Sequence, residues 1–157
     1  MLLAICGSIC AQKLAFPDAQ GWGRFAEGGR KGTVYHVTNL NDAGNGSLRD
    51  AVSQPNRIVV FEVSGVIRIN SRIVFKNNLY VAGQTAPGEG ITVYGDGVSF
   101  SGADNIIVRY MRFRMGAVGT KDKDCAGIAN GQNMIFDHCS FAWGQDENFS
   151  INWDNKG

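Results

Sequence analysis

Asparagine recurs at one phase of a repeat of short β-prone runs, and this recurrence constrains the fold more than any other feature of the sequence. Asn78, Asn105 and Asn133 each precede such a run and are 27 and 28 residues apart. Repeats of roughly 20 to 50 residues are typical of solenoids and arrays. In stacked coils the same position lies above itself, so aligned amides can hydrogen-bond along the stack or hold a left-handed bend.

Further short runs lie between and before these asparagines, and each ends in a residue that favours a turn. They cover residues 57–63, 72–76, 91–94 and 98–101. Their spacing is too short for crossover helices, and they are nearly apolar on both faces, which favours parallel strands stacked coil upon coil. The sequence therefore predicts an all-β parallel β-helix. The alternative is a β-sandwich, with strands recurring about every 8 to 12 residues, but it would not explain the recurring asparagine.

One segment, residues 47–53, reads as a helix. Ser47 can act as its N-cap, and Asp50 follows three residues later, an arrangement that resembles a capping box. We expect a short helix before the first coil, where it would cover the open end of the solenoid.

The length and net charge of the chain exclude some partners, and its first residues indicate a compartment. The chain has 157 residues and a formal net charge of +1. We therefore expect one domain, with no overall electrostatic field that would attract nucleic acid or an anionic membrane. Residues 1–12 are apolar and uncharged and resemble a clipped secretory signal peptide, with a buried first strand as the alternative. We therefore expect a secreted protein in which residues 13–157 belong to one domain.

Cysteine usage leaves two interpretations open. If the signal sequence is removed, only Cys125 and Cys139 remain. They could form a disulfide across neighbouring turns of chain or be buried thiols that pack as small apolar groups, and we favour the thiols. The sequence has no Cys-x-x-Cys spacing, which argues against structural zinc.

Several motifs occur in a fixed order from about Phe16 to the last residue. They are FPDAQGWGRFAEGGRKGTVYHVTNLNDAGNGSLRDAV, IVVFEVSGVIRI, LYVAGQTAPGEGI, NIIVRYMRFRMG and NMIFDHCSFAWGQDENFSI. Together they resemble the N-terminal part of a secreted bacterial pectate lyase of polysaccharide lyase family 1. The resemblance implies a right-handed parallel β-helix that cleaves polygalacturonate by β-elimination and uses Ca²⁺. Such lyases are usually more than twice as long, so we expect an N-terminal fragment that is incomplete at its C-terminus.

Acidic residues near the C-terminus are the candidate ligands of that ion. Calcium binds about six to eight oxygen ligands, and bound to the substrate carboxylate it would ease removal of the neighbouring proton. Asp122 and Asp124 would share one face if their segment is extended. The resemblance assigns calcium binding to both, and to Asp146 one coil later. Ser150 stands where the family has a further acidic residue, so Ser150, Glu147 or water is left as the fourth ligand.

The basic and imidazole groups suggest no catalytic base. We interpret Asp137 and His138 as scaffold rather than as a catalytic pair. In the resembled family the base is an arginine on a later coil, a position that none of this chain's arginines matches, so we name no catalytic residue. Arg112 and Arg114 alternate with apolar residues. They are candidates to contact a polyanion or to pair with acidic neighbours along the stack.

The leading hypothesis is a calcium-dependent pectate lyase that acts on polygalacturonate as a monomer, with no nucleic-acid or membrane partner. We expect little or no lyase activity from these residues alone. One alternative is a pectin lyase. Asp122 and Asp124 argue against it, because such enzymes lack calcium ligands. Another is a non-catalytic β-helix that binds a polysaccharide or a surface, which the missing arginine would fit equally well.

Overall fold

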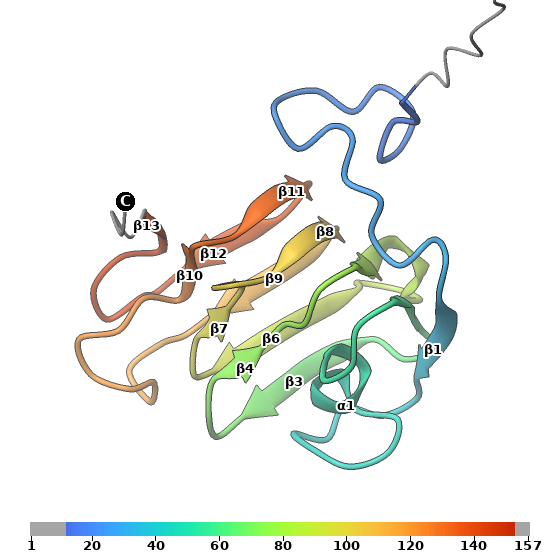
Figure 1. Ribbon diagram of the computed structural model, residues 1–157. Coiled ribbons are helices and arrows are strands. Elements are labelled where there is room, and N and C mark those ends of the chain that lie inside the picture. The colour runs from blue at the N-terminus through green and yellow to red at the C-terminus, as the bar shows by residue number, and fades with distance from the viewer. Residues whose placement is uncertain (1–11, 153–157) are drawn as a thin grey trace, which may run out of the picture.

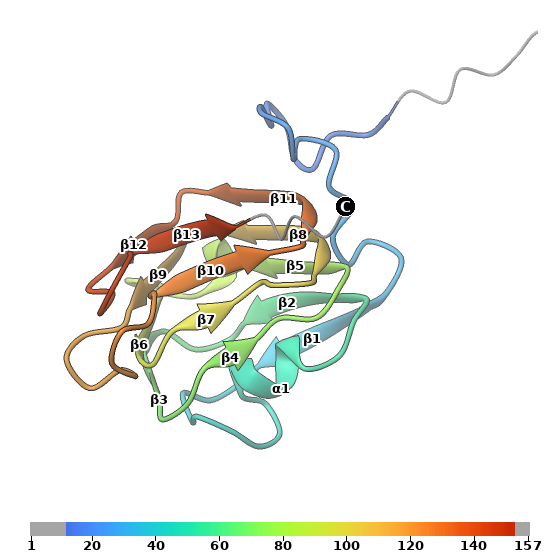
Figure 2. The ribbon, with the colours of Figure 1, turned by 60° about the vertical axis from the view of Figure 1, so that its left-hand side comes forward.

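The computed structural model of the protein describes residues 12–152, so the predicted signal sequence lies outside the described residues except for Gln12. The described chain winds through three parallel sheets, which we call A, B and C (Figures 1 and 2). Sheet A contains β1 (Thr33–Val37), β2 (Arg57–Phe61), β5 (Leu79–Ala82), β8 (Asp104–Arg109) and β11 (Gln132–Asp137). Sheet B contains β3 (Gly65–Ile69), β6 (Ile91–Gly95), β9 (Met111–Arg114) and β12 (Ser140–Ala142). Sheet C contains β4 (Ile73–Val74), β7 (Val98–Ser99), β10 (Ala126–Ala129) and β13 (Phe149–Asn152).

From β2 onward the chain visits sheets A, B and C in turn, and each strand pairs in parallel with its counterpart one coil away. The predicted all-β parallel β-helix is confirmed, and the β-sandwich alternative is wrong. The short runs lie on strands because their apolar residues face a shared interior while the chain turns between sheets.

The asparagine column forms the bend that leads into sheet A. Asn56, Asn78, Asn105 and Asn133 have φ angles of 61°, 55°, 57° and 57°, in the left-handed region that asparagine tolerates better than most residues. The side-chain nitrogen of Asn78 donates to Oδ1 of Asn56 at 2.9 Å, and that of Asn133 donates to Oδ1 of Asn105. Both predicted roles of this column are confirmed, and Asn56 starts it one coil earlier than the sequence pattern indicated.

The predicted helix is confirmed as α1 (Leu48–Val52), with Ser47 as its N-cap accepting a hydrogen bond from the amide of Asp50 at 3.2 Å. As expected, it precedes the first coil that has strands in all three sheets, and β1 is an additional strand before it. Leu48 and Val52 are buried, and α1 contacts β1, β2 and β4. The helix thus covers the end of the solenoid, where β1 is followed by no strand in sheet B or sheet C before β2. Within residues 12–152, neither α1 nor the 3₁₀ turn η1 (Gly83–Thr85) is long and apolar enough to cross a membrane.

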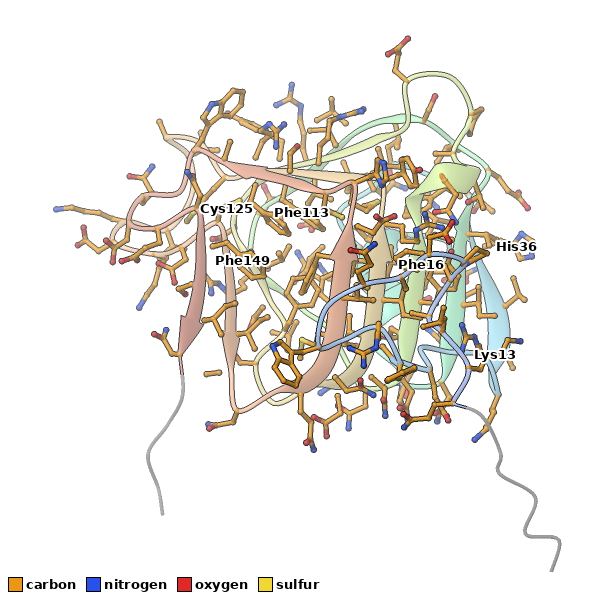
Figure 3. The ribbon with its side chains drawn as sticks, turned by 90° about the horizontal axis from the view of Figure 1, so that it is seen from above. Lys13, Phe16, His36, Phe113, Cys125 and Phe149 are labelled. Atoms are coloured by element: carbon orange, nitrogen blue, oxygen red, sulfur yellow. The ribbon has the colours of Figure 1, made fainter. Side chains whose placement is uncertain are left out.

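Aromatic side chains from successive coils fill the interior. The ring centroids of Phe75 and Phe100 are 4.4 Å apart, and those of Phe141 and Phe149 are 4.5 Å apart. Figure 3 looks into this core, with Phe113 and Phe149 inside it. Cys125 is buried and Cys139 is half-buried, and both are free thiols, as predicted. Burial raises the pKa of each thiol.

The segment before β1 crosses the outer face of sheet A. Ala15, Ala19 and Ala26 pack there on Ile107. Gly23 lies so close to the backbone of β11 that an added Cβ would lie 1.8 Å from the carbonyl oxygen of Met134. Sheet A is therefore covered on its outer side by this segment.

Candidate metal centre and the neighbouring basic face

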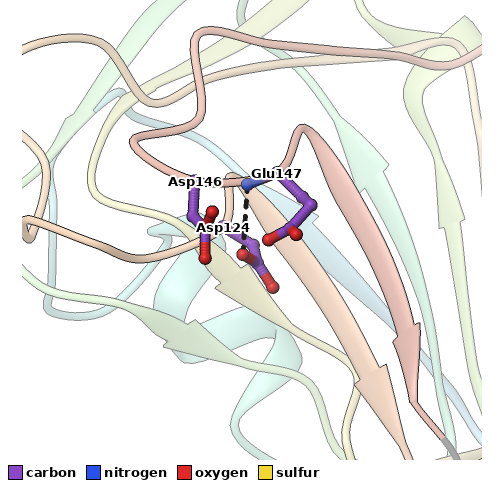
Figure 4. Close-up of side chains that lie close together, drawn as sticks. All are labelled: Asp124, Asp146 and Glu147. Atoms are coloured by element: carbon purple, nitrogen blue, oxygen red, sulfur yellow. Dashed lines mark hydrogen bonds between the residues drawn. The ribbon is translucent and has the colours of Figure 1, made fainter.

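Three acidic side chains meet where the chain enters sheet C. Asp124, Asp146 and Glu147 each offer one carboxylate oxygen, and these oxygens lie within 4.8 Å of one another (Figure 4). Asp124 lies just before β10, and the other two lie in the loop before β13, one coil away. Asp124 is half-buried, whereas Asp146 and Glu147 are exposed.

Backbone pairing holds these two loops together. The parallel register of β10 and β13 continues outward, since the amide of Cys125 donates to the carbonyl oxygen of Glu147 at 3.0 Å. The amides of Gln145 and Asp146 donate to the carbonyl oxygen of Lys123 at 3.0 and 3.2 Å. The acidic residues are therefore adjacent because the coils stack, although they are distant in sequence.

Hydrogen bonds inside the group move two pKa values in opposite directions. The hydroxyl of Ser150 donates to Oδ2 of Asp124 and lowers the pKa of that carboxyl, and the amide of Glu147 donates to its Oδ1 at 3.3 Å. The pKa of Glu147 is raised, first by its side-chain hydrogen bond with Asp124 and then by the negative charge of Asp146. Neighbouring negative charge that raises the pKa of a carboxyl also attracts cations, so this acidic group favours a bound cation.

The structure brings some of the predicted ligands together but not all of them. Asp124 and Asp146 are brought together, and Glu147, which was one option for the fourth ligand, joins them. Asp122 is not part of the group. Its segment is a turn, with φ of 56° at Asp122, so the expected strand-like sharing of one face with Asp124 is wrong. Ser150, the other protein option, donates to Asp124.

Asp137 and His138 belong to a separate network on the outer side of the bend between sheets A and B. Asp137 accepts from Nε of Arg109 at 2.6 Å and lies 2.9 Å from Nδ1 of His138. Burial alone would raise the pKa of Asp137, but its hydrogen bonds with Arg109 and His138 and the charge of Arg109 together outweigh burial, so the pKa is lowered. Neither residue is among the acidic group at sheet C. This position fits the scaffold interpretation.

The outer face of sheet B is basic. The registers of β3, β6, β9 and β12 align two rows of outward residues. One row is Val66, Thr92, Arg112 and Ser140, and the other is Arg68, Tyr94, Arg114 and Ala142. Within residues 12–152, the salt bridges include none of the three arginines. Arg112 donates from Nε to Thr92 Oγ1 at 2.9 Å, and Arg114 donates to Ser140 Oγ at 2.7 Å. The alternative that Arg112 and Arg114 pair with acidic neighbours is thus not found in the described part of the chain.

Aromatic rings lie under two of these charges. The guanidinium carbon of Arg68 lies 5.2 Å from the ring centroid of Tyr94, and that of Arg114 lies 5.9 Å from that of Trp143. These four residues line an open groove of about 430 Å³. Trp143 is 61% exposed, has φ of 65° and lies on the loop that carries Asp146. Sequence reasoning missed Arg68, Tyr94 and Trp143, although the alternating apolar residues of β3 and β6 were a usable signal for the first two.

No protein-family profile matches the chain. The chain is 64% identical over 141 residues to "Probable pectate lyase C" of Aspergillus oryzae, covering 90% of this chain and 34% of that protein. It is 60% identical over 150 residues to "Probable pectate lyase C" of Aspergillus terreus, covering 96% of this chain and 36% of that protein. The chain therefore spans about a third of the length of the curated relatives it matches. These relatives are fungal and do not support the bacterial source that the resemblance implied.

A plant protein and a solved structure extend the comparison. "Pectate lyase 5" of Ambrosia artemisiifolia is 25% identical over 146 residues, covering 79% of this chain and 36% of that protein. The crystal structure of the major allergen from cedar pollen matches with a TM-score of 0.62 at 17% identity, covering 85% of this chain and 47% of that chain. The second likeness shows the β-helix fold alone.

Proposed function

We propose that this chain belongs to the pectate lyase family, polysaccharide lyase family 1, and forms part of a calcium-dependent lyase that acts on polygalacturonate as a secreted monomer. The observation that carries the proposal is three carboxylates within 4.8 Å of one another beside a basic face without acidic partners in the described residues. The identity of 60 to 64% to relatives named probable pectate lyases supports the family.

The acidic group fits calcium on its donor set. Ca²⁺ prefers carboxylate and other oxygen ligands at about 2.3 to 2.6 Å, so two ligands on opposite sides of one ion are about 5 Å apart. One oxygen each from Asp124, Asp146 and Glu147 satisfies that limit. Bound there, the ion would polarise a substrate carboxylate and acidify the proton on the neighbouring carbon. We retain Asp122 as a predicted further ligand because it is exposed in the turn two residues before Asp124.

The basic face of sheet B supports an anionic polymer as substrate. Arginine pairs with carboxylates through two parallel hydrogen bonds, and Arg68, Arg112 and Arg114 carry positive charge that no described carboxylate neutralises. The half-buried Tyr94 and the exposed Trp143 add aromatic surface in the groove of Arg68 and Arg114. A uronate chain on this face would be oriented by its carboxylates toward the arginines and would end close to the loop of Asp146.

In such a reaction the acidic and the basic residues have two separate roles. The acidic group holds a cation, and the arginines bind and orient the polymer. We assign proton abstraction to none of the residues in the described part of the chain. A second candidate function is a non-catalytic β-helix that binds anionic polysaccharide, and the same basic face favours it. A pectin lyase is disfavoured, since a methyl-esterified chain gives neither the arginines nor the three carboxylates a role.

One assay separates these functions. Polygalacturonate is incubated with the protein in calcium and in a chelator, and the unsaturated uronide product is followed by its ultraviolet absorbance, while binding is measured on the same polymer. Calcium-dependent product supports the lyase. Binding without product from a form as long as the curated relatives supports the binding module. Product that forms equally well in chelator would contradict the calcium mechanism.

A further inference from the structure

A second hollow opens at the opposite ends of the sheet B strands from the acidic group. It has a volume of about 480 Å³, within the range of small-molecule sites. Its walls include Gly83, Tyr110 and His138, at the bends that lead into sheet B, together with Arg112 and Glu89. Because it lies before those strands and the acidic group lies after them, it is separate from the proposed metal centre.

An interrupted aromatic column forms one wall of this hollow. Ala82 pairs with Arg109, which pairs with Asp137, so Gly83, Tyr110 and His138 come next in three successive coils. The rings of Tyr110 and His138 stack, with centroids 4.5 Å apart and planes inclined by 12°. Residue 83 is glycine, so no third ring continues the stack. An added Cβ there would lie 2.6 Å from the carbonyl oxygen of Tyr110.

The two rings are held in an uncommon backbone conformation. Tyr110 and His138 have φ angles of 55° and 52°. The left-handed region is unfavourable for residues with a side chain, and such outliers concentrate at functional sites. Tyr110 is nevertheless 40% exposed, so interior packing does not account for its ring.

Polar groups flank the place that the column leaves open. Arg112 donates from Nε to Thr92 and from one Nη to the carbonyl oxygen of Glu89, which leaves further N–H groups of its fork available. The exposed Glu89 carboxylate can accept from hydroxyls. His138 uses Nδ1 toward Asp137 and retains Nε2. An aromatic face beside a cation without a carboxylate partner in the described residues suits a ring that carries both C–H groups and a carboxylate.

We propose that this hollow is a binding subsite for one uronate residue of an anionic polysaccharide, with its sugar ring on Tyr110 and its carboxylate at Arg112. The identity of the polymer rests on the proposed function. The C–H groups of a pyranose face carry partial positive charge, which the negative face of the tyrosine ring attracts. Arg112 and Arg114 point outward from one strand two residues apart, or about 7 Å. The subsite therefore continues the basic face of sheet B to its far edge.

The test is binding of saturated trigalacturonate to the 157-residue chain in chelator, measured by isothermal titration calorimetry. Tyr110→Asn removes the ring and keeps a residue that tolerates the left-handed backbone, whereas Tyr110→Phe keeps the ring. We expect Tyr110→Asn and Arg112→Gln each to weaken binding at least about tenfold, and Tyr110→Phe to leave it within about twofold. Val34→Asn, an exposed change on β1, is the matched surface control. Galactotriose, which lacks the carboxylates, should bind more weakly and should not respond to Arg112→Gln.

The outcomes separate this inference from the proposed function. If wild type fails to bind in chelator, or if a folded Tyr110→Asn variant binds as tightly as wild type, the subsite is wrong. Equal affinity for galactotriose would overturn the uronate assignment. If Tyr110-dependent binding is present but a form as long as the curated relatives makes no unsaturated product, the lyase function fails and the subsite stands. Circular dichroism and the unfolding midpoint verify that each variant is folded.

Discussion

Ser150 donates its hydroxyl hydrogen bond to Oδ2 of Asp124 across the parallel pair of β13 and β10. The contact lowers the pKa of Asp124 and engages one carboxylate oxygen with a neutral donor. In the resembled family an acidic residue stands at this position. Residue 150 on β13 therefore determines whether the proposed metal centre has three carboxylates or four.

Replacing Ser150 with aspartate should strengthen calcium binding. A fourth carboxylate adds negative charge to the ligand set, and we expect affinity to rise about tenfold. Ser150→Ala, which removes the hydroxyl without adding charge, should change affinity by less than about threefold. Calorimetric titration with calcium measures both variants. No gain for Ser150→Asp would show that β13 does not face the ion.

Neutralising Asp124 should cost more calcium affinity than neutralising Asp122. Asp124 lies inside the acidic group, whereas the turn at Asp122 holds its carboxylate outside that group. We expect at least about a tenfold loss for Asp124→Asn and a smaller loss for Asp122→Asn. Asp18→Asn, an exposed change on the segment before β1, is the control. Equal losses for Asp122 and Asp124 would restore the two residues as an equivalent pair.

The asparagine column should be sensitive to backbone conformation as well as to the amide. Asn105→Gly loses the hydrogen bond with Asn133 but keeps the left-handed φ at little cost, so we expect a loss of about 1 kcal/mol. Asn105→Ala adds the left-handed penalty and should lose about 2 to 3 kcal/mol. Urea unfolding measures both. Identical losses would mean that the bend imposes no strain on residue 105.

The ion pair of Asp137 with Arg109 should make stability fall in acid. The folded pKa of Asp137 is lowered below its unfolded value of about 3.9, so its contribution is complete above that value and is lost as pH falls through the folded pKa. We expect Asp137→Asn to cost about 1 to 3 kcal/mol near neutral pH and progressively less as pH falls through the folded pKa of Asp137. Urea unfolding across this range checks the convergence. A constant difference at every pH would exclude the pair as its origin.

Features that repeat along the chain were predictable from sequence, and features set by one loop were not. Asn78, Asn105 and Asn133 predicted the coils because stacking demands the same backbone bend at the same phase. Asp122 was misplaced because an i, i+2 spacing places two side chains on one face only in an extended segment, and this segment is a turn. Tyr110 and Trp143 gave no local signal, since aromatic residues seldom adopt a left-handed φ.

The segments that join sheet B to sheet C differ in length from coil to coil, being residues 70–72, 96–97, 115–125 and 143–148. The two longer ones carry the acidic group, while the strands on either side keep their register. Insertions and deletions in these segments would therefore change which ion or sugar is bound without disturbing the hydrogen bonds between coils. Such a solenoid can evolve a new specificity one loop at a time, because the parts that set its shape and the parts that set its chemistry mutate independently.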